Sequence, residues 1–184
     1  MWPRNPVSNS GFAGPPSMNV IGILPTGQNY HIAFFFLSNE RTTSYAWGLT
    51  QLRAMFTECG VLPGVFVTDR ELAEMNAIQE IFPEAAHLLC RRHINKCVHK
   101  FIKELLGNNY SYFERQIKRR WSRIVKAKTP ELYEQAVAEM TEAWAIQPRF
   151  MDYCKRQWLD PYHDRFAHAW TKDILHYGAD TTNK

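Results

Sequence analysis

The chain has 184 residues, 45% hydrophobic and 14% aromatic, which suits one domain with a packed core and excludes a disordered chain. Its net charge of +4 is mildly basic, which is compatible with a nucleic-acid partner without identifying one. The longest apolar run, residues 32–37, is too short to cross a bilayer, so no membrane partner is expected.

Residues 1–16 are rich in proline, glycine, serine and asparagine, unlike a secretory signal. We predict that they form an irregular segment. The chain contains four unevenly spaced cysteines, Cys59, Cys90, Cys97 and Cys154. Free thiols in a reducing intracellular compartment are therefore expected.

The first regular elements are short apolar runs. Residues 19–24 and 31–37 lie on either side of turn-forming residues 25–28, which predicts a β-hairpin. Residues 40–59 then follow a helical period, and Gly60 stands where a helix-ending glycine is common.

Strand and helix patterns alternate in the next part of the chain. Residues 64–67 are typical of a short buried strand, and the helical pattern after them should end before Pro83. Residues 86–90 form another run short enough for a strand. We expect residues 19–90 to form a sheet of about four strands with two helices.

From Arg91 onward the pattern is helical. The first helix should reach Leu106, with Gly107 closing it. Further helices are expected over residues 110–128, 130–146, 148–158 and 163–177. Residues 91–177 should therefore be almost wholly helical.

Several separate segments, in the same order along the chain, resemble the Mutator-like element (MULE) transposase family. They are residues 36–40 (FLSNE), 45–47 (YAW), 67–71 (VTDRE), 76–78 (NAI), 82–83 (FP), 87–94 (HLLCRRHI), 158–159 (WL), 169–170 (AW) and 176–183 (HYGADTTN). Such a series is far more specific than one short motif, and it covers the chain from about residue 17 to the end.

The resemblance implies an RNase H-like fold, a mixed five-stranded sheet flanked by helices. The hairpin would supply its second and third strands, and residues 65–68 and 86–90 its fourth and fifth. The first strand has no counterpart, so we expect a sheet without it, followed by an all-helical C-terminal half. We expect three divisions of the chain. Residues 1–16 would be an irregular segment, residues 17–107 a partial RNase H-like core, and residues 108–184 a helical region of the transposase core.

The family resemblance also implies DNA strand cleavage and joining with Mg²⁺ or Mn²⁺ held by two aspartates and a glutamate. Asp69 corresponds to one of them and is the ancestral metal-binding carboxylate. The first aspartate would precede Glu40, where no acidic residue occurs, and the glutamate would follow Lys184. We therefore expect the chain to be the central region of a transposase core, truncated at both ends. It should be catalytically inactive and have no cofactor of its own.

Asp69 also has a purely structural interpretation. Thr68 and Glu71 fit a capping box, and an aspartate in the first helical turn complements the helix dipole. Local context alone favours the cap, whereas the resemblance favours descent from a metal ligand.

Cys90 and His93 match a cysteine–histidine pair of the family. A zinc site needs four ligands, and Cys97, one helical turn further on, is a third candidate. We favour the alternative of a buried thiol beside a packed histidine.

A basic stripe is expected on the helix over residues 110–128. Arg115, Arg119, Arg123 and Lys126 form it, opposite an apolar stripe. It is suited to DNA phosphates, although a solvated charged face is the commoner explanation. The positive surface is extended by Arg91, Arg92, Lys96, Lys100 and Lys103.

The leading interpretation is a MULE transposase-derived domain that is inactive by itself. DNA at the element ends is the ancestral partner, and the location is nuclear, or intracellular for a non-functional remnant. The alternative is a domesticated DNA-binding or protein-interaction module without enzymatic activity. A missing strand would expose a sheet edge, which predicts self-association.

Overall fold

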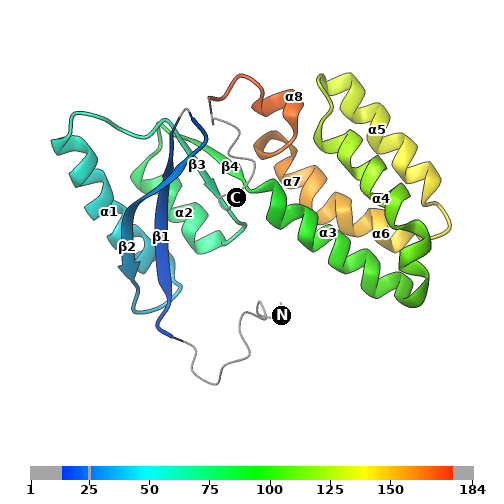
Figure 1. The fold of residues 1–184 in the computed structure, drawn as a ribbon, viewed down its shortest axis with the longest axis horizontal. Helices are drawn as coiled ribbons and strands as arrows, with labels where there is room; N and C mark the ends of the chain where they lie inside the picture. The colour runs from blue at the N-terminus through cyan, green and yellow to red at the C-terminus, as the bar shows by residue number, and fades with distance from the viewer. Residues whose placement is uncertain (1–13, 25, 176–184) are drawn as a thin grey trace.

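The computed structural model describes residues 14–24 and 26–175. Figure 1 shows two lobes, which we call the sheet lobe (residues 17–89) and the helical lobe (residues 91–171). The sheet lobe contains β1 to β4 with α1 and α2, and α3 leads from β4 into the helical lobe.

The chain enters the sheet lobe through an antiparallel hairpin of β1 (Ser17–Ile23) and β2 (Asn29–Phe36). Ser17 pairs with Phe36 at one end of the hairpin and Ile23 with Asn29 at the other, and the register shifts between Val20 and Ile21. Gly27 turns the chain with a φ of 78°, a conformation that glycine adopts without steric cost. The predicted hairpin is confirmed.

Two helices share a core with this hairpin. α1 (Thr42–Glu58) and α2 (Leu72–Ile81) pack on each other, and their apolar stripes meet the inner side of β1 and β2. The buried side chains of this core are Met18, Leu37, Tyr45, Leu49, Leu52, Ala77, Ile78 and Phe82. The predicted helix boundaries agree with the structure to within two residues or so.

The second strand pair is parallel. β3 (Val65–Thr68) and β4 (Ala86–Leu89) pair in register, with Val65 opposite Ala86, and α2 makes the crossover. The four described strands therefore form two two-stranded sheets, where one sheet was expected. The reason is that no described strand joins the hairpin to the parallel pair, which is the place the first strand of the expected fold would take. Residues 1–13 lie outside the described residues.

The helical lobe contains α3 (Arg91–Leu106), α4 (Tyr110–Val125), α5 (Pro130–Ala143), α6 (Pro148–Cys154), α7 (Asp160–Tyr162) and α8 (His168–Thr171). A 3₁₀ turn over Gly107–Asn109 connects α3 to α4, and a π-helical turn over Lys155–Leu159 joins α6 to α7. Within residues 14–24 and 26–175 no strand follows Leu89, which confirms the predicted change to helix.

One predicted helix is wrong. Residues 163–175 form a 3₁₀ turn over His163–Arg165 and the short α8 instead of a continuous helix. The interruption falls at Phe166 and Ala167, which are fully buried in the lobe's core, and Arg91 binds the carbonyl of Phe166 at 2.6 Å. Tertiary contacts therefore override the local pattern; residues 176 and 177 lie outside the described residues.

The helical lobe has its own core, centred on Ile102, Ile117, Trp121 and Phe150. Met75 of α2 and the last residue of β4 belong to the same cluster, so the two lobes are packed together. None of the helices in the described part of the chain is long and apolar enough to cross a membrane.

Candidate functional site

The parallel pairing brings the family-motif residues to one edge of the sheet lobe. Asp69 directly follows β3 and Cys90 directly follows β4, and the backbone N–H of Cys90 donates to the carbonyl of Thr68 at 2.7 Å. His93 lies in the first turn of α3. We call this region the carboxyl edge, since the carboxyl ends of parallel strands are where such folds place their polar sites.

A second carboxylate approaches Asp69 from α2. Burial, and after it the negative charges of Asp69 and Glu71, raise the pKa of Glu74 to about 7. The three acidic side chains are therefore close enough for their charges to interact. Burial also raises the pKa of Tyr45 in α1, with Glu74 as the largest of several negative neighbours, so α1 borders the same cluster.

Sequence reasoning did not find Glu74. The available signal was its position on the stripe that carries Ala77 and Ile78, three and four residues later, both of which are buried. A glutamate on the apolar face of a helix is uncommon and indicates a shifted pKa.

Cys90 and His93 contact each other. A hydrogen bond with Cys90 raises the pKa of His93, and the negative charge of Asp69 also raises it, whereas burial and Lys96 oppose the shift. Cys90 is buried. The pair therefore lies close enough to Asp69 for the charge of this carboxylate to act on His93.

The capping box predicted for this loop is not formed. Glu71 itself is the N-cap of α2, and its carboxylate accepts a hydrogen bond from the N–H of Ala73 at 3.3 Å. The hydroxyl of Thr68 instead donates to the carbonyl of Asp69 at 2.8 Å and lies 2.8 Å from Nε2 of His87. Asp69 is thus left out of the capping arrangement.

Burial lowers the pKa of His87 to about 4, so this histidine is neutral near pH 7. A hydroxyl that already donates to a carbonyl accepts from its second partner, so Nε2 of His87 carries the hydrogen. The contact links Thr68, the last residue of β3, to the second residue of β4.

Arg70 fixes this loop to the helical lobe. Its guanidinium lies 4.3 Å from the ring centre of Trp158 and donates to the carbonyl and to Oε1 of Gln157 at 2.7 and 3.2 Å. Both partners belong to the π-helical turn after α6. Such turns are frequent near functional sites because they redirect side chains locally.

The fit of these residues to a divalent cation is partial. Mg²⁺ and Mn²⁺ prefer carboxylate oxygens, which Asp69 and Glu74 offer, but the carboxylate of Glu71 is engaged in the helix cap. Nowhere in residues 14–24 and 26–175 are three histidine, cysteine, aspartate or glutamate side chains placed to hold a metal ion. Cys97 is therefore not placed to act as a third metal ligand beside Cys90 and His93.

The predicted basic stripe is divided in the structure. Arg115 and Arg119 are exposed on α4 and Lys126 is exposed at its end, but Arg123 forms an ion pair with Glu139 of α5. Arg91 is engaged in packing as well, since it also donates to Oγ1 of Thr171 at 3.0 Å. The four stripe residues therefore all face solvent, with Arg123 paired to Glu139, whereas Arg91 is half-buried.

Part of the chain matches the model of a known protein family. The model of the MULE transposase domain matches residues 13–97, from just before β1 into α3, and this range includes every residue of the carboxyl edge. Residues 13–97 thus match a MULE transposase region, which confirms the resemblance there and suggests a transposase-derived function. No match is found among curated proteins.

Proposed function

We propose that this chain is a MULE transposase-derived domain that does not cut DNA by itself. The ancestral activity would be DNA transposition by metal-dependent strand cleavage and joining. The observation that carries the proposal is the convergence of Asp69, Glu74, Cys90 and His93 at one edge of the matched region. We further infer that the sheet lobe is RNase H-like in origin, which the antiparallel hairpin followed by a parallel strand–helix–strand unit supports.

The charges at this edge argue against cleavage by the chain alone. Metal-dependent phosphoryl transfer needs several ionised carboxylates around cations about 4 Å apart. Glu74, with a pKa of about 7, is only partly ionised at neutral pH. His93 lies close enough to Asp69 for the negative charge of this carboxylate to raise its pKa, so a cation bound at Asp69 would share the carboxylate with the imidazole.

The test is a cleavage assay on supercoiled plasmid and on duplex DNA with Mg²⁺ or Mn²⁺. Wild-type protein should behave like Asp69→Ala, with no metal-dependent nicking or joining by either. Asp152→Ala, which changes an exposed carboxylate of α6, is the matched control. Metal-dependent cutting by wild type and the control variant, lost in Asp69→Ala, would overturn the proposed inactivity.

A second candidate is a DNA-binding module without enzymatic activity, acting in the nucleus. It is favoured by the exposed Arg115 and Arg119 on α4. Self-association is a further part of the proposal, since Phe34 and Phe36 of β2 are 55% and 68% exposed side by side on the outer face of the hairpin.

A further inference from the structure

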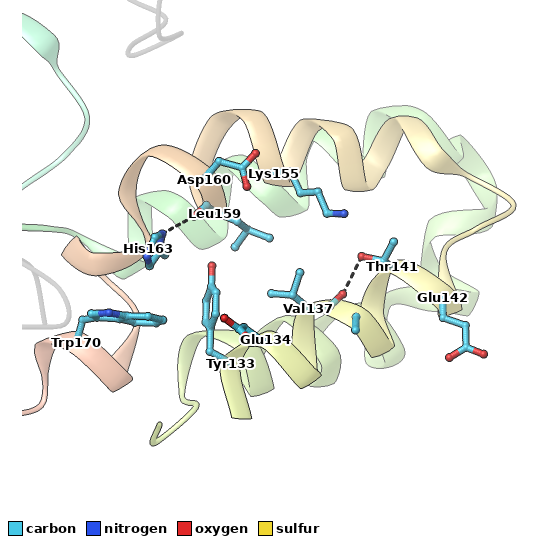
Figure 2. A pocket seen from close by; sticks show the side chains of 11 residues that line it. Tyr133, Glu134, Val137, Thr141, Glu142, Lys155, Leu159, Asp160, His163 and Trp170 are labelled. Carbon is cyan, nitrogen blue, oxygen red and sulfur yellow. Dashed lines mark hydrogen bonds between the residues drawn. The ribbon is translucent and has the colours of Figure 1, made fainter. Parts of the chain in front are cut away.

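The helical lobe contains a pocket that lies outside the matched region. It opens between α5 and the segment from the π-helical turn to α8, and its volume is about 860 Å³. This is within the size range of binding sites for small molecules or single side chains with their flanking backbone. Figure 2 shows the side chains that line it.

Three rings form one end of the pocket. Tyr133 of α5, His163 and Trp170 lie in mutual contact, with ring centres 5.6, 5.0 and 4.6 Å apart for the pairs Tyr133–His163, Tyr133–Trp170 and His163–Trp170. The rings of Tyr133 and Trp170 are perpendicular. A lining of clustered aromatic rings is one against which a cation can pack.

The hydroxyl of Tyr133 is the most informative group in the pocket. Tyr133 is only 7% exposed, and its hydroxyl is buried with no hydrogen-bond partner in the described part of the chain. In Figure 2 this hydroxyl points into the space between α5 and the segment that carries Leu159 and Asp160. A buried polar group without a partner is destabilising, so its presence suggests that a ligand supplies the partner.

A second acceptor follows from the hydrogen bond of His163. Its Nδ1 lies 2.8 Å from the carbonyl of Leu159, and because a carbonyl only accepts, Nδ1 carries the hydrogen. In the neutral ring Nε2 is then a lone-pair acceptor, like the oxygen of Tyr133. Both suit a ligand that donates several N–H bonds.

The charged residues around the pocket favour a positively charged ligand. Its lining includes three carboxylates, of Glu134, Glu142 and Asp160, against the single ammonium of Lys155. With histidine counted as neutral, three negative charges and one positive charge give a net charge of −2. Phosphate-bearing ligands, DNA included, are repelled by such a lining, whereas a cation is attracted.

We propose that this pocket binds an arginine side chain of a basic peptide segment. The planar guanidinium matches the aromatic rings, and its N–H groups suit the oxygen of Tyr133, Nε2 of His163 and the carboxylate of Asp160. In Figure 2 the side chain of Lys155 extends away from the three rings, so the cation would enter at the end of the pocket that holds the rings.

Calorimetric titration of the full chain tests this proposal. The probe is the N-acetylated and C-amidated tripeptide glycyl-arginyl-glycine, compared with the same tripeptide containing citrulline, which is isosteric but uncharged. The arginine peptide should bind at least about tenfold more tightly. Asp160→Asn should weaken its binding by about tenfold, whereas Asp152→Asn, on an exposed residue outside the pocket, should change it by less than about twofold.

Tyr133→Phe separates a ligand-binding role from a folding role. If the hydroxyl serves a ligand, its removal should weaken peptide binding about threefold or more while raising the melting temperature by about 2–4 °C, because an unpartnered buried group is lost. Equal binding of the citrulline peptide, binding unaffected by Asp160→Asn, or no binding of the arginine peptide to the folded protein at about 10 mM would overturn the proposal. So would tighter binding of adenosine monophosphate than of the arginine peptide.

Discussion

Replacing Arg70 by methionine should weaken the joint between the two lobes. Methionine keeps the aliphatic part of the side chain but removes the guanidinium that contacts Trp158 and donates twice to Gln157. A hydrogen bond from a charged donor contributes about 1.5–3 kcal/mol, and a cation–π contact about 0.5–2 kcal/mol. Since the second hydrogen bond, at 3.2 Å, is long and the surroundings relax, we expect a total loss of about 3 kcal/mol in the free energy of unfolding.

This loss is measurable by urea denaturation and by thermal melting. For a chain of this length it corresponds to a melting temperature about 6–12 °C lower. Arg115→Met, on an exposed residue of α4, is the matched control and should change the free energy of unfolding by less than about 0.5 kcal/mol. If Arg70→Met and Arg115→Met had the same stability, the guanidinium contacts would not hold the lobes together and the reasoning would be wrong.

Three further predictions concern α2, α5 and α4. The pKa of Glu74 is raised from 4.5 to about 7, so its contribution to stability is full below pH 4.5 and is lost as pH rises through 7. In urea denaturation at pH 8, the free energy of unfolding of Glu74→Gln should therefore exceed that of wild type by about 1–3 kcal/mol. Glu80→Gln, on the exposed face of the same helix, should show no such gain. Thr129→Ala should lose about 1 kcal/mol in the same assay, because the hydroxyl caps α5 by accepting from the N–H of Leu132 at 3.3 Å, and Thr129→Ser should recover most of it. If α4 binds DNA, the double variant Arg115→Gln/Arg119→Gln should reduce the slope of log affinity against log salt concentration by about 2, as measured by fluorescence anisotropy. Arg123→Gln should change this slope less, because Arg123 is paired with Glu139.

The elements of the fold could largely be predicted from the sequence, because they depend on local patterns. Short apolar runs on either side of turn-forming residues identify β1 and β2, and glycines with positive φ stand after α1 and α3 at Gly60 and Gly107. The pairing of strands could not be predicted in the same way. Whether the hairpin joins β3 depends on a further strand between them, and no local pattern supplies that information.

The candidate site was predictable only where the residues follow strand ends. Asp69, Cys90 and His93 lie at the carboxyl edge as the order of elements requires. Glu74 and Arg70 depend on tertiary contacts, with Asp69 in one case and with Trp158, far along the chain, in the other. The interrupted helix at Phe166 has the same origin, since burial and Arg91 determine the backbone there.

We propose that the carboxyl edge is the remnant of a metal-dependent DNA-processing site. Paramagnetic line broadening by Mn²⁺ in amide NMR spectra of the full chain tests it most directly. We predict weak binding, on the order of 1 mM, with broadening concentrated on residues 69–74 and 90–93 and reduced in Asp69→Asn but not in Asp152→Asn. Broadening spread over other carboxylates, or unchanged in Asp69→Asn, would contradict the account.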